Sequence, residues 1–277
     1  MCLLASGLLD LVFKLYAAKP RSRGMLVFGI GCVWMILQSG YMSYMGIELN
    51  ISGPTLTFGV LAAVVVTASN LLLLECLGHL PISMASTIYR LNTVPLVILA
   101  YFFLNEEISI IQFSGILAGI VTVFLLYRPA QVSQLAAGYV RSYLLLIITA
   151  GCLRALYGVF TKAGISAGGQ PESMILFAAI GWCVGGLAYA YFRERRVVIT
   201  RDKLKFISVA GALVFLVIWL LTAALTLGEA STVVPIANMG FVAAFILSIM
   251  VGMEHLNRRT LAAIGCACLS ILLLTSS

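Results

Sequence analysis

Long apolar runs alternate with short polar segments along the whole chain. Each run holds roughly 17 to 23 residues, about the length that an α-helix needs to cross a hydrocarbon core of about 30 Å. The pattern predicts an all-α integral membrane protein with ten transmembrane helices. The predicted spans are 1–18, 25–45, 55–77, 82–103, 109–127, 142–164, 173–192, 206–227, 231–252 and 260–275. The first run is expected to be retained, because Asp10 interrupts it and no basic residues precede it.

The spans fall into two groups of five, separated by the polar stretch from Arg128 to Arg141. We assign residues 1–129 to a first five-helix repeat, 130–141 to an inter-repeat loop and 142–277 to a second repeat. Two pairs of residues support a duplication, because Lys14 and Lys162, and likewise Glu106 and Glu254, are each 148 positions apart. Since five is odd, the second copy must enter the membrane from the opposite side. We therefore predict two inverted repeats around a central cavity.

Composition agrees with a membrane protein and excludes a soluble one. The chain is 62% hydrophobic and 10% charged, with a mean hydropathy of +1.09, and one soluble core could not bury so much apolar surface. The net charge of +7 offers no basic face of a soluble domain, so a nucleic-acid partner is not expected. The expected partners are the lipid bilayer and a small-molecule substrate, and a homodimer is left open.

The positive charges predict the orientation of the chain. If both termini lie on the non-cytoplasmic side, the basic residues of the loops all face inward, and the outward loops hold only acidic ones. The expected location is the plasma membrane, in a bacterium the inner membrane. The inward residues are Lys19, Arg21, Arg23, Arg128, Arg141, Arg193, Arg195, Arg196, Arg201, Lys203, Lys205, Arg258 and Arg259.

Ionisable side chains within the predicted spans are the candidate functional residues, because each costs at least about 2.5 kcal/mol in the membrane interior. They are Asp10, Lys14, Glu75, Arg90, Arg154 and Lys162. Cations outnumber anions by four to two, which favours a substrate with an anionic group. Lys14, Arg90, Arg154 and Lys162 are therefore candidates for substrate binding, and Asp10 and Glu75 for proton coupling.

Each candidate also has a structural interpretation. Asp10 and Lys14 are four residues apart and could form a helical ion pair. Lys162 lies near an outward end and could extend to the interface, and Glu75 could be an interfacial carboxylate. Arg90 could be tied to Asp10 or Glu75 purely to hold helices together. These alternatives stay open at the level of sequence.

Polar residues surround Arg90 and recur in the second half. Ser83, Thr87 and Arg90 share one face of an apolar helix, and Asn92 follows. The matching helix carries Pro235 and Asn238, and a proline at membrane depth frees a backbone carbonyl. We add Asn92 and Asn238 to the candidates for substrate binding.

No metal or cofactor site is predicted. The seven cysteines are scattered without a C-x-x-C spacing, and only two histidines are present, so the thiols are interpreted as small buried hydrophobes. Gly115 and Gly119, and likewise Gly181 and Gly185, are four apart and are expected to let helices approach closely.

An acidic corner recurs near the end of each half of the chain. The first corner has Glu106, Ile108 and Ser109, with Gly115 nine residues after Glu106. The second has Gly252, Glu254, Leu256 and Asn257, with Ala263 in place of the glycine. These corners resemble those of the EamA-like family in the drug/metabolite transporter superfamily, in which each half ends in a proline-containing helix, a glycine-glutamate corner and a glycine about nine residues on. The segment LGEASTVVPIANMGF at 227–241 is similar to the short loop and ninth helix of such transporters.

The resemblance implies ten helices around a central cavity, alternating access, and export or exchange of small metabolites. Together with the surplus of cations, it predicts a secondary active transporter of solutes with an anionic or zwitterionic group. A flippase or exporter of a lipid-linked substrate is the alternative. An integral membrane enzyme is not expected, because the chain has neither paired aspartates nor a His-Glu-x-x-His motif.

Overall fold

The computed structural model describes residues 2–17, 21–77, 79, 85, 88–126, 137–195, 197, 200–240 and 258–275, and these residues are helical or lie in short connections. Within these ranges, five helices are long and apolar enough to cross a membrane, and shorter apolar helices accompany them. The prediction of an all-α protein with membrane-spanning helices is confirmed. The five long helices are Arg23–Met45, Gly53–Leu77, Arg141–Ser166, Pro171–Glu194 and Arg201–Leu227.

Apart from the fourth and ninth spans, the helices follow the predicted spans closely. In chain order they are α1 (Cys2–Ala17), α2 (Arg23–Met45), α3 (Gly53–Leu77), α5 (Thr93–Leu104), α6 (Ile110–Leu126), α7 (Ala137–Ser166), α8 (Pro171–Tyr189), the π-helical turn η2 (Ala190–Glu194), α9 (Arg201–Leu227), α10 (Ala230–Asn238) and α12 (Arg258–Thr275). Helix α7 begins inside the segment assigned to the inter-repeat loop 130–141. Ser83, Thr87, the corner at Glu254 and the ninth span beyond residue 240 lie outside the described residues.

Local signals explain several helix ends. The Ser22 hydroxyl accepts a hydrogen bond from the Met25 N–H at 3.2 Å, which caps the start of α2. Gly46 ends the same helix with a φ of 65°, a left-handed conformation that glycine adopts without strain. Pro171 opens α8 at a position where a missing N–H costs nothing.

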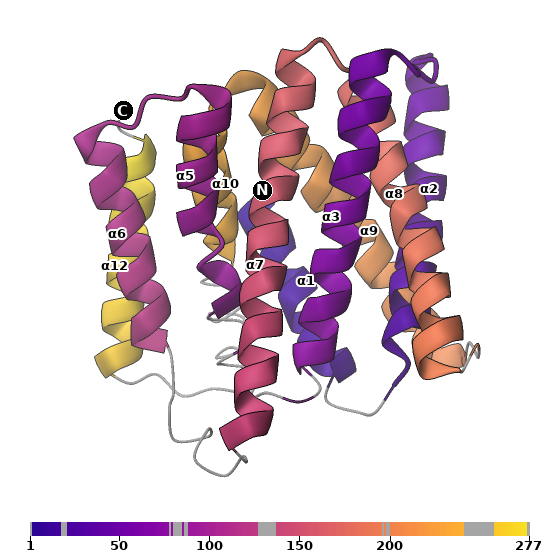
Figure 1. Ribbon diagram of the computed structural model, residues 1–277, viewed down its shortest axis with the longest axis horizontal. Helices are drawn as coiled ribbons and strands as arrows, with labels where there is room; N and C mark the ends of the chain where they lie inside the picture. The colour runs from indigo at the N-terminus through magenta and orange to yellow at the C-terminus, as the bar shows by residue number, and fades with distance from the viewer. Residues whose placement is uncertain are drawn as a thin grey trace.

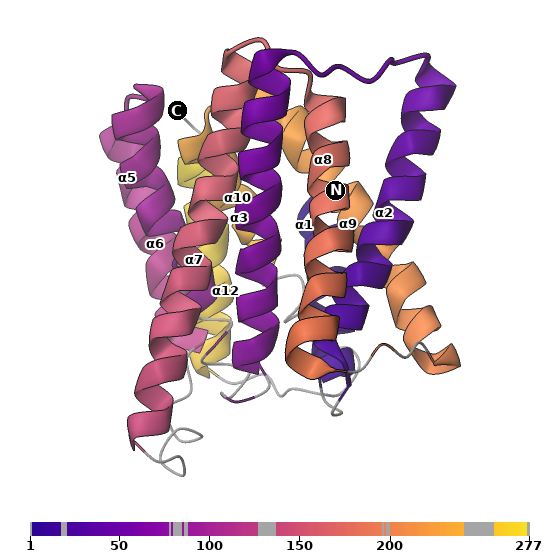
Figure 2. The same ribbon diagram turned by 45° about the vertical axis from the view of Figure 1, so that its right-hand side comes forward.

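The helices run side by side in a bundle, with α6 and α12 at one end of its long axis and α2 at the other (Figures 1 and 2). Helix α2 packs on α8, α6 on α12, and α5 on α10. Helix α3 packs on α7 while α1 packs on α9, and α3 packs on α8 while α2 packs on α9. The contacts are therefore preserved when α1, α2, α3, α5 and α6 are exchanged with α7, α8, α9, α10 and α12, which we call the corresponding helices.

Corresponding helices also begin at equal spacing in the chain. Helices α8, α9 and α12 start 148 positions after α2, α3 and α6, respectively. Trp34 and Trp182 have the same spacing, and their rings meet edge to face with centroids 5.8 Å apart. Chain spacing and packing thus agree on which helices correspond.

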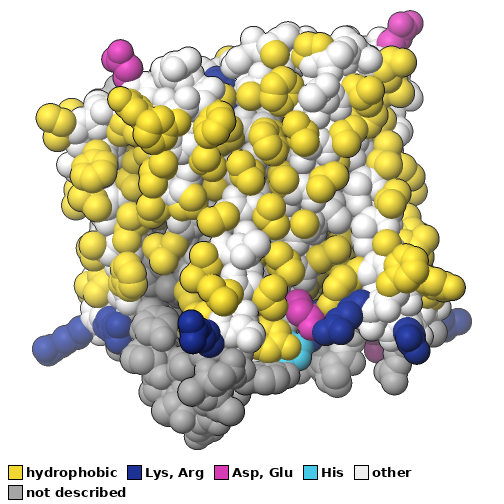
Figure 3. All heavy atoms as spheres, in the orientation of Figure 1, with side chains coloured by type: hydrophobic (Ala, Val, Ile, Leu, Met, Phe, Trp, Pro, Cys, Tyr) yellow, Lys and Arg dark blue, Asp and Glu magenta, His cyan; other side chains and the backbone are white. Residues whose placement is uncertain are grey.

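Hydrophobic and charged side chains lie at different levels of the outer surface. In Figure 3 a broad hydrophobic belt covers the visible face. Acidic side chains lie at the two upper corners, and most of the visible Lys and Arg side chains lie along the lower edge, with further acidic side chains beside them. Large apolar side chains are exposed on the outside of the bundle, among them Phe102 and Phe103, each 71% exposed. Such a surface suits contact with lipid rather than water.

Glycines allow α2 and α8 to come unusually close. A Cβ atom placed on Gly186 would lie 2.3 Å from the backbone nitrogen of Phe28, and one on Gly24 would lie 2.5 Å from that of Ala190. The predicted glycine pair on α8 behaves in the same way, because a Cβ on Gly181 or Gly185 would collide with α3. Small residues therefore fix the spacing of α2, α3 and α8.

We expect Gly186→Ala to destabilise the protein by about 1 to 3 kcal/mol, because its methyl group would meet backbone atoms that cannot move aside. Gly40→Ala, on the open side of α2 with nothing within 4 Å, is the matched control. Thermal unfolding of both variants in detergent measures the difference. Equal melting temperatures for the two variants would contradict the close approach.

Candidate functional site

The fourth predicted span is broken where its polar residues lie. Residues 88–90 are helical, 91–92 form a turn, and α5 starts at Thr93. Pro95 accounts for the break, because it has no N–H to donate to the Leu91 carbonyl and its ring would clash with that group in a continuous helix. The break interrupts the hydrogen-bond ladder inside the bundle and leaves polar groups free for contacts with other helices.

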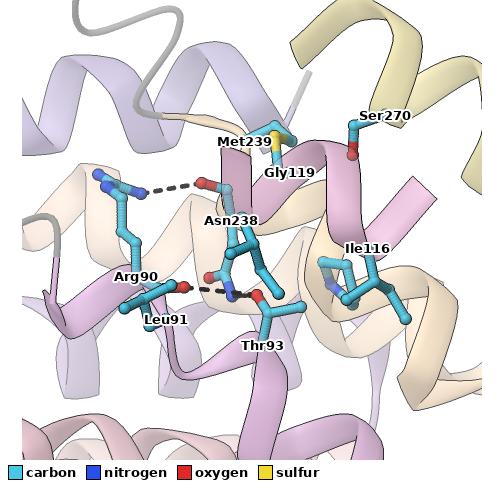
Figure 4. Close-up of a pocket in the computed structure, with 10 residues that line it drawn as sticks. Arg90, Leu91, Thr93, Ile116, Gly119, Asn238, Met239 and Ser270 are labelled. Atoms are coloured by element: carbon cyan, nitrogen blue, oxygen red, sulfur yellow. Dashed lines mark hydrogen bonds between the residues drawn. The ribbon is translucent and has the colours of Figure 1, made fainter. Parts of the chain in front are cut away.

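A corresponding break lies at the end of α10, which contains Pro235 and stops at Asn238. The Asn238 carbonyl accepts a hydrogen bond from Nη1 of Arg90 at 2.9 Å, and these two residues are 148 positions apart. The Asn238 amide donates to Oδ1 of Asn92 at 2.6 Å and to Oγ1 of Thr93 at 3.2 Å. The two broken helices therefore face each other through polar groups, as Figure 4 shows.

Asp10 reaches this cluster from α1 and forms an ion pair with Arg90. Helix α1 runs along α9, from Cys2 near the Val217 carbonyl to Tyr16 beside Phe206. The pair is only partly exposed, at 17% for the Arg90 side chain and 37% for that of Asp10. Mutual pairing offsets the cost of placing each charge among apolar helices. Of the two carboxylates that the sequence offered as partners of Arg90, the structure pairs it with Asp10; the role of this pair stays a prediction.

Arg154 brings a second guanidinium to the same region from α7. It interacts electrostatically with Arg90 and lies over the ring of Tyr157, 5.1 Å from the ring centroid. In the described part of the chain no carboxylate lies within ion-pair distance of Arg154. Asp10, Arg90 and Arg154 therefore form a set of two positive charges and one negative charge.

A small cavity lies between the broken helices, with Arg90, Thr93, Pro235, Asn238 and Ser270 in its wall (Figure 4). It offers about 10 Å³ to the centre of a water-sized sphere, which is room for about one water molecule. An organic solute therefore needs the surrounding helices to separate before it can enter.

Glu75 belongs to a different network, at the end of α3. Its carboxylate pairs with Arg23 of α2 and accepts a hydrogen bond from the Tyr189 hydroxyl of α8. Nδ1 of His79 donates a hydrogen bond to the Glu75 carbonyl at 2.9 Å, and the His79 ring stacks on Tyr143 with centroids 4.4 Å apart. This network joins four helices at the end of the bundle that carries most of the basic residues.

The two candidate lysines are placed differently from the arginines. Nζ of Lys162 donates to the carbonyls of Leu225 at 2.9 Å and Gly228 at 2.6 Å, and so satisfies the end of α9. Lys14 lies one turn after Asp10 on α1, and its side chain is outside the described part of the structure. A role for either lysine in binding stays a prediction.

Sequence reasoning found the central residues of the cluster but not all of its partners. Arg23 was counted only as a loop charge, yet it pairs with Glu75. Ser270, whose hydroxyl donates to the Gly115 carbonyl at 2.7 Å, is an inconspicuous serine in an apolar helix. The 148-residue spacing would have singled out Arg90 with Asn238 as facing positions. Among the described residues no three His, Cys, Asp or Glu side chains gather to hold a metal ion.

Asp10→Ala should leave Arg90 without its carboxylate and lower the free energy of unfolding by about 1 to 3 kcal/mol, less than for a fully buried pair. Removing both charges with Asp10→Ala and Arg90→Leu together should recover part of the loss. Thermal unfolding of the two single variants and the double variant gives the coupling energy. A double variant whose loss equals the sum of the single losses would show that the pair contributes nothing.

Comparison with known proteins agrees with this architecture. Residues 141–276 match the EamA-like transporter family. Among 29 matching chains of solved structures, one described only as "Crystal structure of protein" aligns with a TM-score of 0.81 over 99% of this chain and 96% of that chain. Its sequence identity is 15%, so the likeness shows the fold alone. No curated protein matches the chain. Residues 141–276 are thus assigned to the EamA-like transporter family, which is part of the drug/metabolite transporter superfamily.

Proposed function

We propose that the protein is a secondary active transporter that moves small organic metabolites with an anionic or zwitterionic group by alternating access. The observation that carries the proposal is the set formed by Asp10, Arg90 and Arg154, which has one more positive charge than negative charge. Arg90, the member of this set that interacts with both others, lines a cavity within the bundle. A carboxylate or phosphate group of a substrate would neutralise that charge and accept bidentate hydrogen bonds from a guanidinium.

The broken helices support a binding site at this position. Transporters built from inverted repeats bind their substrates near the bilayer midplane, between discontinuous helices of the two halves. Here the turn at 91–92 and the end of α10 at Asn238 are such interruptions, and they meet at the cavity. We further propose that the chain comprises ten helices in two inverted repeats. The 148-residue spacing of corresponding helices and their reciprocal packing support this arrangement.

The charge distribution supports an orientation with both termini outside. The ends of α2, α7, α9 and α12 that carry Arg23, Arg141, Arg201 and Arg258 would then face the cytoplasm. The cavity would open alternately toward this basic rim and toward the opposite end, where Glu107, Glu172 and Glu229 lie. The plasma membrane is the proposed location.

Arg154 gives a sharper test of substrate binding than Arg90. Removing Arg154 leaves no described carboxylate without its ion-pair partner, whereas removing Arg90 deprives Asp10 of its partner. We expect at least one carboxylate, phosphorylated sugar or amino acid in a metabolite panel to raise the melting temperature of the wild-type protein. Arg154→Ala should abolish that shift, and Arg201→Ala, an exposed arginine on α9, should keep it. Thermal-shift screening that includes lipophilic cations measures both expectations. Stabilisation by cations alone, or an unchanged shift in Arg154→Ala, would remove this site from the proposal.

Coupling to protons is proposed to run through Asp10 or Glu75, whose partners Arg90 and Arg23 would be released on protonation. Uptake of the stabilising compound into proteoliposomes should depend on a pH gradient in the wild-type protein. The double variant Asp10→Asn, Glu75→Gln should lose this dependence, while the exposed control Asp202→Asn should retain it. Transport that keeps its pH dependence in the double variant would refute coupling through these groups.

A further inference from the structure

The corner between α5 and α6 turns an acidic side chain into the bundle. Asn105 ends α5 in a left-handed conformation with a φ of 52°, which asparagine tolerates better than most residues. The next residue, Glu106, is thereby directed inward and is only 6% exposed, whereas its neighbour Glu107 is exposed. Two adjacent glutamates thus have very different surroundings.

The Glu106 carboxylate is bound to the start of α10. Oε1 accepts a hydrogen bond from the Ala230 N–H and Oε2 accepts one from the Ser231 N–H, both at 2.8 Å. These donors belong to the first turn of the helix, where N–H groups lack partners within the helix and where the helix dipole favours a negative charge. A residue 124 positions earlier in the chain therefore caps α10.

A second contact ties the same turn of α10 to α6. Ser109 and Gln112 form a reciprocal cap at the start of α6, with hydrogen bonds of 2.9 and 3.1 Å. The Gln112 amide, oriented by this cap, also donates to Oγ1 of Thr232 at 2.9 Å. Both sides of the α5–α6 corner thus hold α10 in place.

Helix α10 connects this corner to the candidate site. It has nine residues, with the Glu106 contacts at its start and Asn238 at its end, and it carries Pro235 in the cavity wall. Because the helix is short, a displacement of its first turn would be passed to Asn238 and to the contacts of Asn238 with Arg90 and Asn92. The cavity admits about one water while these contacts are made.

We propose that Glu106 is a latch that keeps the transport cavity closed at the end of the bundle opposite the basic rim, and that its release from α10 opens that end. The inference rests on the proposed function, since it assigns this residue the control of one of the two access states. Glu106 acts as a positioning residue, because it touches α10 and not the solute. When α10 moves, water would accept hydrogen bonds from the two N–H groups that Glu106 releases. The contact is therefore reversible, although the Glu106 carboxylate is buried in the closed state.

Glu106→Gln tests the latch, with Glu107→Gln as the matched control. Glutamine keeps the shape but offers one acceptor oxygen, and its NH₂ group would face an amide N–H. In a cysteine-free background, Ser270→Cys places a thiol in the cavity wall. A membrane-impermeant maleimide is added to intact cells and, separately, to inverted membrane vesicles. We expect Glu106→Gln to raise the labelling rate about tenfold over Glu107→Gln in the one preparation that exposes the acidic end.

The outcomes separate a latch from a merely structural cap. Faster labelling in one preparation supports the latch, whereas equal rates in both variants, or equal acceleration from both sides, overturn it. If Glu106→Gln does not fold, Thr232→Val removes only the Gln112 contact and should produce a smaller acceleration on the same side. An unchanged rate in that variant would then overturn the latch. Ligand-induced stabilisation of the wild-type protein is measured separately, so the latch can fail while the proposed transport function stands.

Discussion

The arrangement of the bundle depends on satisfying one guanidinium among apolar helices. Arg90 obtains a carboxylate from α1 and a backbone carbonyl from the end of α10, so three segments distant in sequence must converge on it. An unpaired arginine would be too costly at this depth. The convergence also explains why the helices on either side are interrupted.

Around this centre the helices are held mainly by close contact. Lipid provides no hydrophobic driving force between helices, so association relies on van der Waals packing and on scattered hydrogen bonds. The approach of α2 to α8 at Gly24 and Gly186 supplies the first. The hydrogen bonds lie mainly at helix ends. Lys162 binds the end of α9 and Glu106 binds the start of α10. At the start of α2, the Ser22 hydroxyl and the Arg23 amide both donate to the Glu194 carboxylate. Tight packing far from the cavity and breakable polar contacts near its two ends are what a rocking mechanism requires.

The proposed function and the proposed latch concern different parts of this design. In the proposed function, the charge set of Asp10, Arg90 and Arg154 selects the type of substrate group. The Glu106 contact concerns access, because it controls whether α10 can leave its neighbours. The networks at the two ends differ in chemistry. Glu75 pairs with the side chains of Arg23 and Tyr189, while Glu106 binds backbone amides. The two ends are therefore expected to open with different energetic requirements.

The sequence by itself determined the membrane class, the positions of most of the described helices and the resemblance to a transporter family. Recurring apolar runs with the length of a membrane span, separated by short polar segments, are typical of a multi-pass membrane protein. It also identified Asp10, Arg90, Arg154, Asn92 and Asn238, because charged or amide groups stand out in apolar helices. Only the tertiary structure decided their partners. Whether Arg90 meets Asp10 or Glu75, or whether Glu106 faces outward or caps a distant helix, depends on which helix faces lie together. The pattern of apolar residues says little about which helix faces pack together, because lipid and helix surfaces are equally apolar. The packing is set by small residues and by interruptions of the helices, whose effect depends on the neighbouring helix.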